Sequence, residues 1–120
     1  MIKIAPSILS ADFSAMGQAV ERMQASGADY IHCDVMDGIF VPNITFGPPM
    51  IKSIKKHADI PLDVHLMIDR PERYIDAFAD AGADIITIHA EATLHAERTL
   101  AYIKSKGIKA GIVLNPATHE

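Results

Sequence analysis

The sequence predicts an α/β protein built around a parallel sheet. Five short apolar runs, typical of strands, alternate with four segments whose apolar residues recur at helical spacing. The runs are too continuously apolar for a sheet with one wet face, which favours strands buried on both faces. A weak internal repeat is also present, because residues 26–32 resemble residues 81–87, with a looser copy at 106–110. This alternation predicts a parallel fold, either a barrel or an open sheet.

The elements follow from local signals along the chain. The five predicted strands cover residues 3–9, 30–35, 62–68, 84–89 and 110–114. The first helix should follow Ser10 as its N-cap. The second should begin near Pro48 and the third at Pro71, since proline suits the first turn of a helix. The fourth should run from about residue 94 to 106 and end at Gly107.

The length of the chain bounds its organisation. With 120 residues it can form one core but not two comfortable domains, so we expect a single domain over residues 1–120. Strand starts recur about every 26 residues, and eight such units would need roughly 210 residues, close to the size of a (β/α)₈ barrel. The chain should therefore hold about four and a half βα units. Such a piece exposes sheet edges, so either further units lie outside this sequence or two copies complete one another as a homo-oligomer.

Composition limits the classes of binding partner and indicates where the protein is located. The formal charge is −4 and no basic residues cluster, which argues against nucleic acid or an anionic membrane as a partner. Cys33 is the single cysteine, which excludes an internal disulfide. The first residues do not form a signal peptide and no apolar run is long enough to span a membrane, so we expect a cytoplasmic protein. Cys33 alternates away from its polar neighbours and should pack under a helix.

Two of the predicted strands carry histidine and carboxylate on one face, because residues two apart in a strand point the same way. These residues are His32, Asp34 and Met36 on one strand and Asp63, His65 and Met67 on the next. Two imidazoles and a carboxylate at neighbouring strand ends predict a metal site or an acid–base centre. The nitrogen and oxygen donors suit Zn, Fe, Mn or Co better than Mg or Ca. The alternative is that these groups only satisfy each other's hydrogen bonds.

Other polar residues allow two interpretations each. Ser7 could bind a substrate hydroxyl or serve as a turn residue. Asp63 lies one layer deeper than His65 and is more typical of an orienting or structural carboxylate than of a base. Asp37, before a glycine, indicates first a turn. His89, at the end of the fourth predicted strand, could line the opening of the site predicted at His32, Asp34 and His65, or have a supporting or core role.

Methionines and the remaining histidines are also ambiguous. Met36 and Met67 could line a pocket above a metal, although core packing is the more common role of methionine. The other three histidines fall on helices or in the tail and are expected at the surface. They are His57, His95 and His119.

With these residues considered together, the chain closely resembles the ribulose-phosphate 3-epimerase family over all 120 residues. The matching stretches are residues 5–13 (APSILSADF), 32–38 (HCDVMDG), 41–43 (VPN), 63–67 (DVHLM) and 115–118 (NPAT). The resemblance implies a (β/α)₈ barrel, of which this chain would supply strands one to five. It also implies an isomerase of the pentose phosphate pathway that interconverts D-ribulose 5-phosphate and D-xylulose 5-phosphate by moving a proton at C3.

The resemblance also assigns roles to residues. It implies one divalent metal ion held by His32, Asp34 and His65, with Asp34 as a catalytic acid–base group as well. Ser7 and His65 would contact the phosphorylated ketose, and Met36 and Met67 would wall the reacting carbon. The fourth ligand, which is also the second acid–base residue, is an aspartate of the seventh strand, and the phosphate-binding loops follow strands six to eight. These have no counterpart here, so the 120-residue chain should bind metal weakly and epimerise poorly.

Three alternatives stay open. The substrate could be a hexulose phosphate such as allulose 6-phosphate, because the part that measures sugar length lies partly beyond these residues. The chain could be a catalytically inactive half-barrel that self-associates. A decarboxylase or aldolase on a related barrel is disfavoured, because such enzymes pair Asp with Lys on the strands and no suitable lysine is present.

Overall fold

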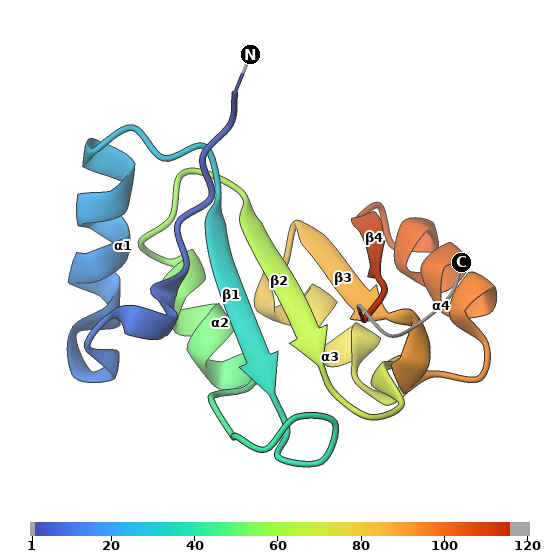
Figure 1. Ribbon diagram of the computed structural model, residues 1–120. Coiled ribbons are helices and arrows are strands. Elements are labelled where there is room, and N and C mark those ends of the chain that lie inside the picture. The colour runs from blue at the N-terminus through green and yellow to red at the C-terminus, as the bar shows by residue number, and fades with distance from the viewer. Residues whose placement is uncertain (1, 116–120) are drawn as a thin grey trace.

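A four-stranded parallel sheet forms the centre of the computed structural model, which describes residues 2–115. The strands are β1 (Ile31–Met36), β2 (Leu62–Met67), β3 (Ile85–His89) and β4 (Lys109–Val113). They are neighbours in chain order, and every pairing is parallel. Figure 1 shows the strands with their helices gathered on one side, so that the other face of the sheet is open to the viewer. The predicted parallel α/β fold is confirmed.

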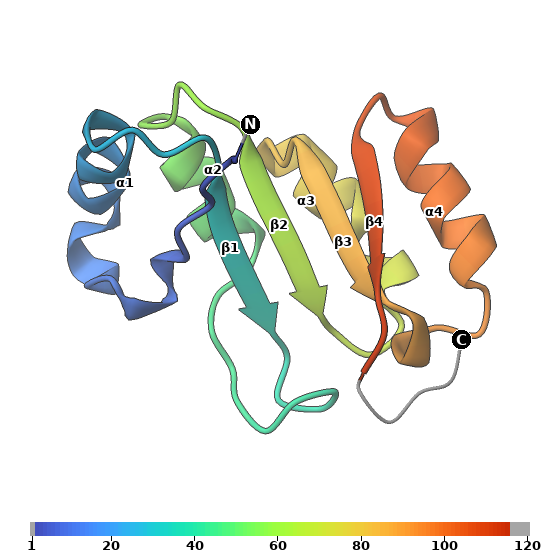
Figure 2. The same cartoon turned by 45° about the horizontal axis from the view of Figure 1, so that its top comes forward.

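In the described part of the chain, one helix precedes β1 and three connect successive strands, each at its predicted place. They are α1 (Met16–Ala25), α2 (Pro48–Lys55), α3 (Ile75–Ala81) and α4 (Ala96–Ser105). Figure 2, turned from the first view, shows α1 and α4 at the two edges and α2 and α3 behind the strands. Within residues 2–115 no helix combines the length and the hydrophobicity that a membrane span requires.

Two helix starts differ from the predictions. The first helix does not begin after Ser10, because the chain makes 3₁₀ turns at Ile8–Ser10 and Phe13–Ala15 before α1. Asp12 caps the second turn, its side chain accepting a hydrogen bond from the backbone N–H of Ser14 at 3.0 Å. Pro71 likewise opens a 3₁₀ turn, and α3 follows from Ile75.

The predicted strand over residues 3–9 is wrong. This segment runs beside β1 but forms only an isolated parallel bridge, between Ser7 and His32. The backbone N–H of His32 donates to the carbonyl of Pro6 at 2.9 Å, and the N–H groups of Asp29 and Tyr30 donate to one carbonyl, that of Ile4. Pro6 has no N–H to return, and the chain turns into 3₁₀ geometry at residue 8, so a continuous ladder does not form.

The core lies between the sheet and the helices. Alternate residues of β1 and β2 are buried beneath α2 and α3, and the residues between them are only half-buried. The buried set in these two strands is Ile31, Cys33, Val35, Leu62, Val64 and Leu66. Phe78 of α3 and Ile51 of α2 are also buried there. The expectation of strands buried on both faces therefore needs correction, since the open face of the sheet is polar and partly accessible.

The internal repeat corresponds to a recurring helix-to-strand turn. Gly27, Gly82 and Gly107 each follow a helix with positive φ, at 95°, 114° and 77°. In the first two copies an aspartate follows two residues later. Its backbone N–H donates to a residue of the preceding segment, and its side chain accepts the N–H of that same residue. Asp84 donates its N–H to the carbonyl of Leu62 and accepts the Leu62 N–H on Oδ2, at 3.0 and 2.8 Å.

Candidate active site

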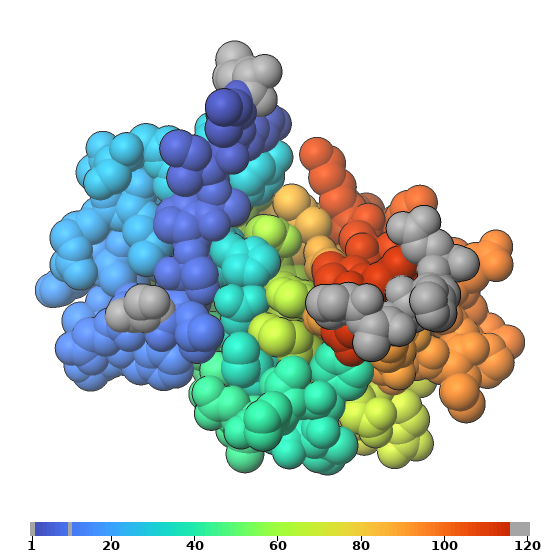
Figure 3. Space-filling view, viewed as in Figure 1, coloured from blue at the N-terminus to red at the C-terminus, as the bar shows by residue number. Residues whose placement is uncertain are grey.

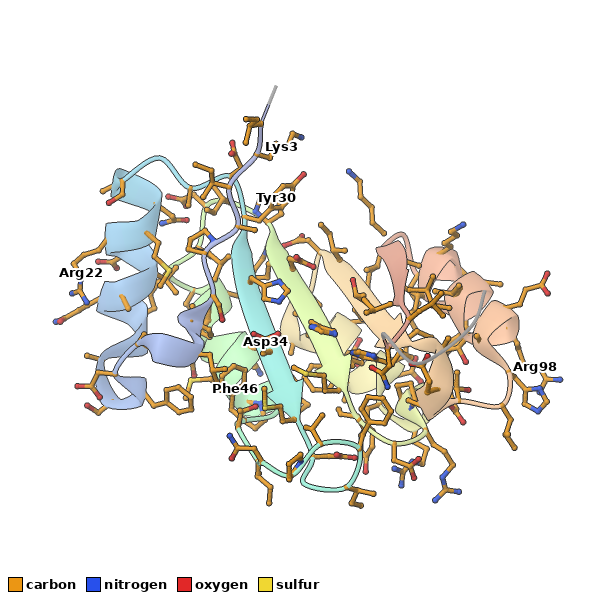
Figure 4. All side chains as sticks on the ribbon, in the orientation of Figure 1. Lys3, Arg22, Tyr30, Asp34, Phe46 and Arg98 are labelled. Atoms are coloured by element: carbon orange, nitrogen blue, oxygen red, sulfur yellow. The ribbon has the colours of Figure 1, made fainter. Side chains whose placement is uncertain are left out.

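His32, Asp34 and His65 converge on the open face of the sheet. Asp34 Oδ1 lies 2.9 Å from His32 Nε2 and 3.1 Å from His65 Nδ1. One donor atom from each residue lies within 4.8 Å of the others, and all three residues are partly buried. Figure 4 places Asp34 on β1, on the face turned away from α2 and α3. The predicted cluster is therefore present, and both histidines reach the same carboxylate oxygen.

Strand register explains the convergence. In the parallel pair β1–β2, Asp34 stands beside His65 and His32 stands beside Asp63. Side chains two apart share a face, so the alternation that buries Cys33 and Val35 against the helices turns the polar residues outward. Cys33 is buried, as predicted, and burial raises the pKa of its thiol to about 12.

Asp63 orients His32. Asp63 Oδ2 lies 2.9 Å from His32 Nδ1, so that ring nitrogen donates to the carboxylate and Nε2 faces Asp34. The hydrogen bond to Asp63 raises the pKa of His32, although burial opposes it. A carboxylate behind a histidine is the usual support of a metal-ligating imidazole. The interpretation of Asp63 as an orienting carboxylate agrees with this contact.

His65 has a second histidine behind it. Nε2 of His65 lies 2.7 Å from Nε2 of His89, and the two rings are nearly parallel with centroids 4.8 Å apart. Burial lowers the pKa of His65, and the neighbouring His89 lowers it further. His65 therefore favours the neutral form, which has the lone pair that a metal ligand needs. Of the two roles left open for His89, the structure places it in support of His65.

Ser7 is a cap residue, as one of its two interpretations predicted, and it also contacts Asp34. Its Oγ donates to Asp34 Oδ2 at 3.1 Å and accepts the N–H of Leu9 at 3.2 Å, which caps the first 3₁₀ turn. The carboxylate of Asp34 is thus divided between two environments. Oδ1 faces the two imidazoles, and Oδ2 faces the serine hydroxyl.

Met36 and Met67 are register partners at the ends of β1 and β2. Neither belongs to the buried core, and both are half-buried on the face that carries His32 and His65. Figure 3 shows this face, where the residues of β1 and β2 reach the surface between the N-terminal segment and β4. The two methionines are therefore placed where they could contact a molecule bound at the cluster.

The loop after β1 is fastened at the edge of the cluster. Thr45 Oγ1 donates to the carbonyl of Asp34 at 2.8 Å and accepts the N–H of Met36 at 3.0 Å. Asp37 is the predicted turn residue, since its Oδ1 accepts the N–H groups of Ile39 and Phe40. Its Oδ2 also accepts the N–H of Asp69 at 2.8 Å, which links the loops that follow β1 and β2.

Sequence reasoning missed several supporting residues. Thr45, Phe40 and Glu91 were not singled out, because each acts from a loop whose path the strand pattern does not define. The ring of Phe40 lies 4.9 Å from that of His89, and Glu91 Oε1 lies 3.8 Å from His89 Nδ1. For Glu91 a signal existed, because it lies two residues beyond a histidine that ends a strand.

The remaining histidines agree with their predictions where the structure describes them. His57 lies at the surface and pairs with Glu21 at 2.8 Å, and His95 is exposed. His119 and the stretch 116–118 lie outside the described residues.

Solved structures give a likeness in fold. A structure of Yersinia pestis DHPS with a pterine-sulfa conjugate matches with a TM-score of 0.67 and 15% sequence identity. The match covers 98% of this chain and 46% of that chain. At this identity the likeness concerns the fold alone. It agrees with a TIM-barrel-like arrangement in which the described strands form about half of a barrel.

Sequence comparisons identify relatives over nearly the whole chain. The chain is 60% identical over 118 residues to "Ribulose-phosphate 3-epimerase" of Bacillus subtilis, and the match covers 98% of this chain and 54% of the relative. It is 52% identical to "Ribulose-5-phosphate-3-epimerase, chloroplastic" of Arabidopsis thaliana, covering 98% of this chain and 42% of the relative. The chain thus spans about half the length of the curated relatives it matches. The family model of the "Ribulose-phosphate 3 epimerase family" matches residues 3–120, and the chain belongs to this family.

Proposed function

We propose that this chain carries the N-terminal half of the active site of a metal-dependent epimerase that interconverts D-ribulose 5-phosphate and D-xylulose 5-phosphate. The observation that carries the proposal is the convergence of His32, Asp34 and His65 on the open face of the sheet, within 4.8 Å of one another. Membership of the ribulose-phosphate 3-epimerase family supports the substrate.

The three residues fit a divalent cation. Two imidazole nitrogens and a carboxylate oxygen point at one another, and in the absence of a cation they need protons between them. Asp63 already binds His32 Nδ1, so His32 can offer only Nε2. Such a donor set suits Zn, Fe, Mn or Co. When bound, the metal would act as a Lewis acid toward the oxygens of the substrate.

Asp34 is proposed to transfer the proton at C3. A proton next to a ketone is weakly acidic, and a positioned carboxylate can remove it or return it. Oδ1 faces the imidazoles, whereas Oδ2 accepts a hydrogen bond from Ser7, so Oδ2 is the oxygen we assign to the proton transfer. Ser7 holds this oxygen at 3.1 Å and can exchange that contact for a substrate hydroxyl.

The surrounding residues would hold the sugar. His65 is proposed to contact the substrate as well as the metal, and Met36 and Met67 to exclude water on either side of C3. Inversion also needs an acid–base group on the opposite face of the planar enediolate. The resemblance assigns that group to an aspartate of a seventh strand, beyond the four strands described. Asp34 alone would therefore exchange a proton on one face.

Three further expectations belong to this proposal. Residues 1–120 are taken as part of a single barrel domain, the protein as a homo-oligomer, and its location as the cytoplasm. Each of these stays a prediction.

Proton exchange in heavy water tests the proposal. The protein is incubated in D₂O with D-ribulose 5-phosphate and Co²⁺, and NMR follows both loss of the C3 proton signal and formation of D-xylulose 5-phosphate. We expect metal-dependent exchange at C3 that outpaces inversion. In Asp34→Asn the exchange rate should fall at least about 100-fold, since general acid–base catalysis contributes about 10²–10⁴-fold.

The matched control is Asp80→Asn, which makes the same change at an exposed carboxylate on α3. This variant should exchange at the wild-type rate. Equal exchange rates for Asp34→Asn and wild type would reject Asp34 as the proton carrier, and exchange that chelator does not diminish would reject the metal.

A further inference from the structure

His89 is the buried partner of one arm of the cluster. It ends β3 with 7% of its surface exposed, and its Nε2 lies 2.7 Å from Nε2 of His65. At this distance one nitrogen must donate a proton to the other, because two lone pairs or two N–H groups would repel. The rings are inclined by only 20°, so the contact fixes the plane of His65 as well as its direction.

The surroundings of His89 Nδ1 decide which of the two Nε2 atoms donates the hydrogen bond. Its Nδ1 is buried and has no hydrogen-bond partner among the described residues, and Glu91 Oε1 lies 3.8 Å from it. A carboxylate at this distance favours an N–H over a lone pair at Nδ1. A neutral His89 with its proton on Nδ1 must accept at Nε2, so His65 donates from its own Nε2 when a cation replaces the proton that otherwise lies between His65 Nδ1 and Asp34.

The consequence falls on the nitrogen of His65 that faces the cluster. A neutral imidazole carries a single N–H, so donation from Nε2 leaves a lone pair on Nδ1. That atom lies 3.1 Å from Asp34 Oδ1, inside the group formed with His32. With the opposite direction of donation, Nδ1 would carry the proton and could not bind a cation.

We propose that His89 is a positioning residue, which with Glu91 behind it holds the ring of His65 so that Nδ1 can present a lone pair to a cation held with His32 and Asp34. The inference rests on the proposed metal site and identifies His89 as the residue that orients its second imidazole, His65. His32 is oriented by a carboxylate, Asp63, whereas His65 is oriented by a histidine that is itself oriented by a carboxylate. Phe40 packs on the ring of His89 at 4.9 Å and limits its rotation.

The first measurement needs no metal. NMR on ¹⁵N-histidine-labelled protein detects scalar coupling across an N–H···N hydrogen bond, and we expect such coupling between Nε2 of His65 and Nε2 of His89. The coupling should vanish in His89→Gln, where the second ring is absent. Absence of the coupling in wild-type protein would overturn the inference, whatever the metal result.

The second measurement is Co²⁺ affinity, with the visible spectrum of the bound ion as a readout of ligand geometry. His89→Phe keeps a ring against Phe40 but removes the hydrogen bond, and should weaken Co²⁺ binding about 10–100-fold and alter the spectrum. His89→Gln retains polar atoms and should recover part of the loss. Glu91→Gln keeps the shape of residue 91 without its charge and should show a smaller loss than His89→Phe.

The control is His57→Gln, which removes a surface histidine near α2 and should leave both affinity and spectrum unchanged. Urea unfolding of each variant separates positioning from misfolding. Wild-type affinity and spectrum in His89→Phe would overturn the inference. If wild-type protein shows the coupling but binds no Co²⁺, the contact between the rings stands and the proposed metal-dependent function fails.

Discussion

Aspartates at the amino ends of the strands and aspartates on the open face of the sheet bind different partners. At the amino ends of the strands, Asp29 and Asp84 bind backbone groups of the segment before them, at Ile4 and Leu62. On the open face, Asp34 in the middle of β1 and Asp63 near the start of β2 bind imidazole rings. Asp29 and Asp84 accept hydrogen bonds from N–H groups that the sheet leaves unpaired. Asp34 and Asp63 instead contact imidazoles, which compete with them for protons.

The difference separates stability from chemistry within one short chain. A carboxylate that accepts backbone N–H groups satisfies donors that would otherwise be unpaired, and its role is structural. A carboxylate that shares an oxygen between two imidazoles is held by groups that could also bind a cation. Substitutions in the two groups of aspartates should therefore have different readouts.

The largest expected effect is that of Asp34→Asn on metal binding. The amide loses the charge and offers one oxygen where Asp34 Oδ1 faced two rings. Co²⁺ affinity, measured by absorbance titration, should fall more than about 100-fold, because loss of an outer support alone costs about 10–100-fold. Retention of wild-type affinity would mean that the ion binds elsewhere. Asp80→Asn serves as the control.

Asp63→Asn should have the next largest effect on the metal. The amide oxygen can still accept from His32 Nδ1, which donates to Asp63 at 2.9 Å in the wild type. However, the charge is lost and the amide can also turn its NH₂ toward the ring, so the ring is held less firmly. We expect Co²⁺ affinity to fall about 10–100-fold. The pKa of His32 should fall as well, because its hydrogen bond to Asp63 is the main cause of its rise. An unchanged His32 titration by NMR would show that Asp63 does not orient this ring.

Substitution of Asp84 should lower stability without affecting metal binding. Asp84→Ala leaves the N–H of Leu62 without its 2.8 Å acceptor, and should lower the free energy of unfolding by about 1–3 kcal/mol. Asp84→Asn can still accept this N–H and loses only the charge opposite Lys55, an accessible pair, so its effect should be about 0–1 kcal/mol. Urea unfolding measures both. Neither variant should change Co²⁺ affinity, and a change would contradict the separation between the two groups of aspartates.

The smallest effect concerns Asp37, a carboxylate that accepts backbone N–H groups at the carboxyl end of β1. Burial raises the pKa of Asp37, but backbone N–H donors from Asp69, Ile39 and Phe40 outweigh it and the pKa is lowered overall. A depressed folded pKa gives stability that is present above the unfolded value, near 3.8, and is lost as the pH falls through the folded value. The stability difference between wild type and Asp37→Asn should therefore hold at about pH 5–7 and shrink below about pH 4. A difference that stays constant with pH would contradict this role.

The sequence predicted most of the site because the site lies on strands. His32, Asp34 and His65 were found from a period of two and from the parallel order of the strands, which together determine which side chains meet. The same pattern could not locate Thr45 or Phe40, since loop paths depend on contacts such as those of Asp37. It also could not choose between the two roles of His89, because that choice depends on the distance to His65.

The failure at residues 3–9 has a related cause. The run is apolar and typical of a strand, but ladder formation requires N–H groups on both sides, and Pro6 has none. Ile4 instead accepts two N–H groups on one carbonyl. The helices were predicted in their places. The starts of α1 and α3 were not, because Asp12 and Pro71 open 3₁₀ turns that helical periodicity does not distinguish from α-helix.

The reciprocal bonds at the amino ends also set an order for assembly during synthesis. The N–H of Ile4 obtains its acceptor from Asp29, 25 residues later, and that of Leu62 from Asp84, 22 residues later. At about 5–20 residues per second, each segment waits roughly 1–5 s on the ribosome before the next unit closes it. Neither bond can therefore form before the turn that carries its aspartate has been synthesised.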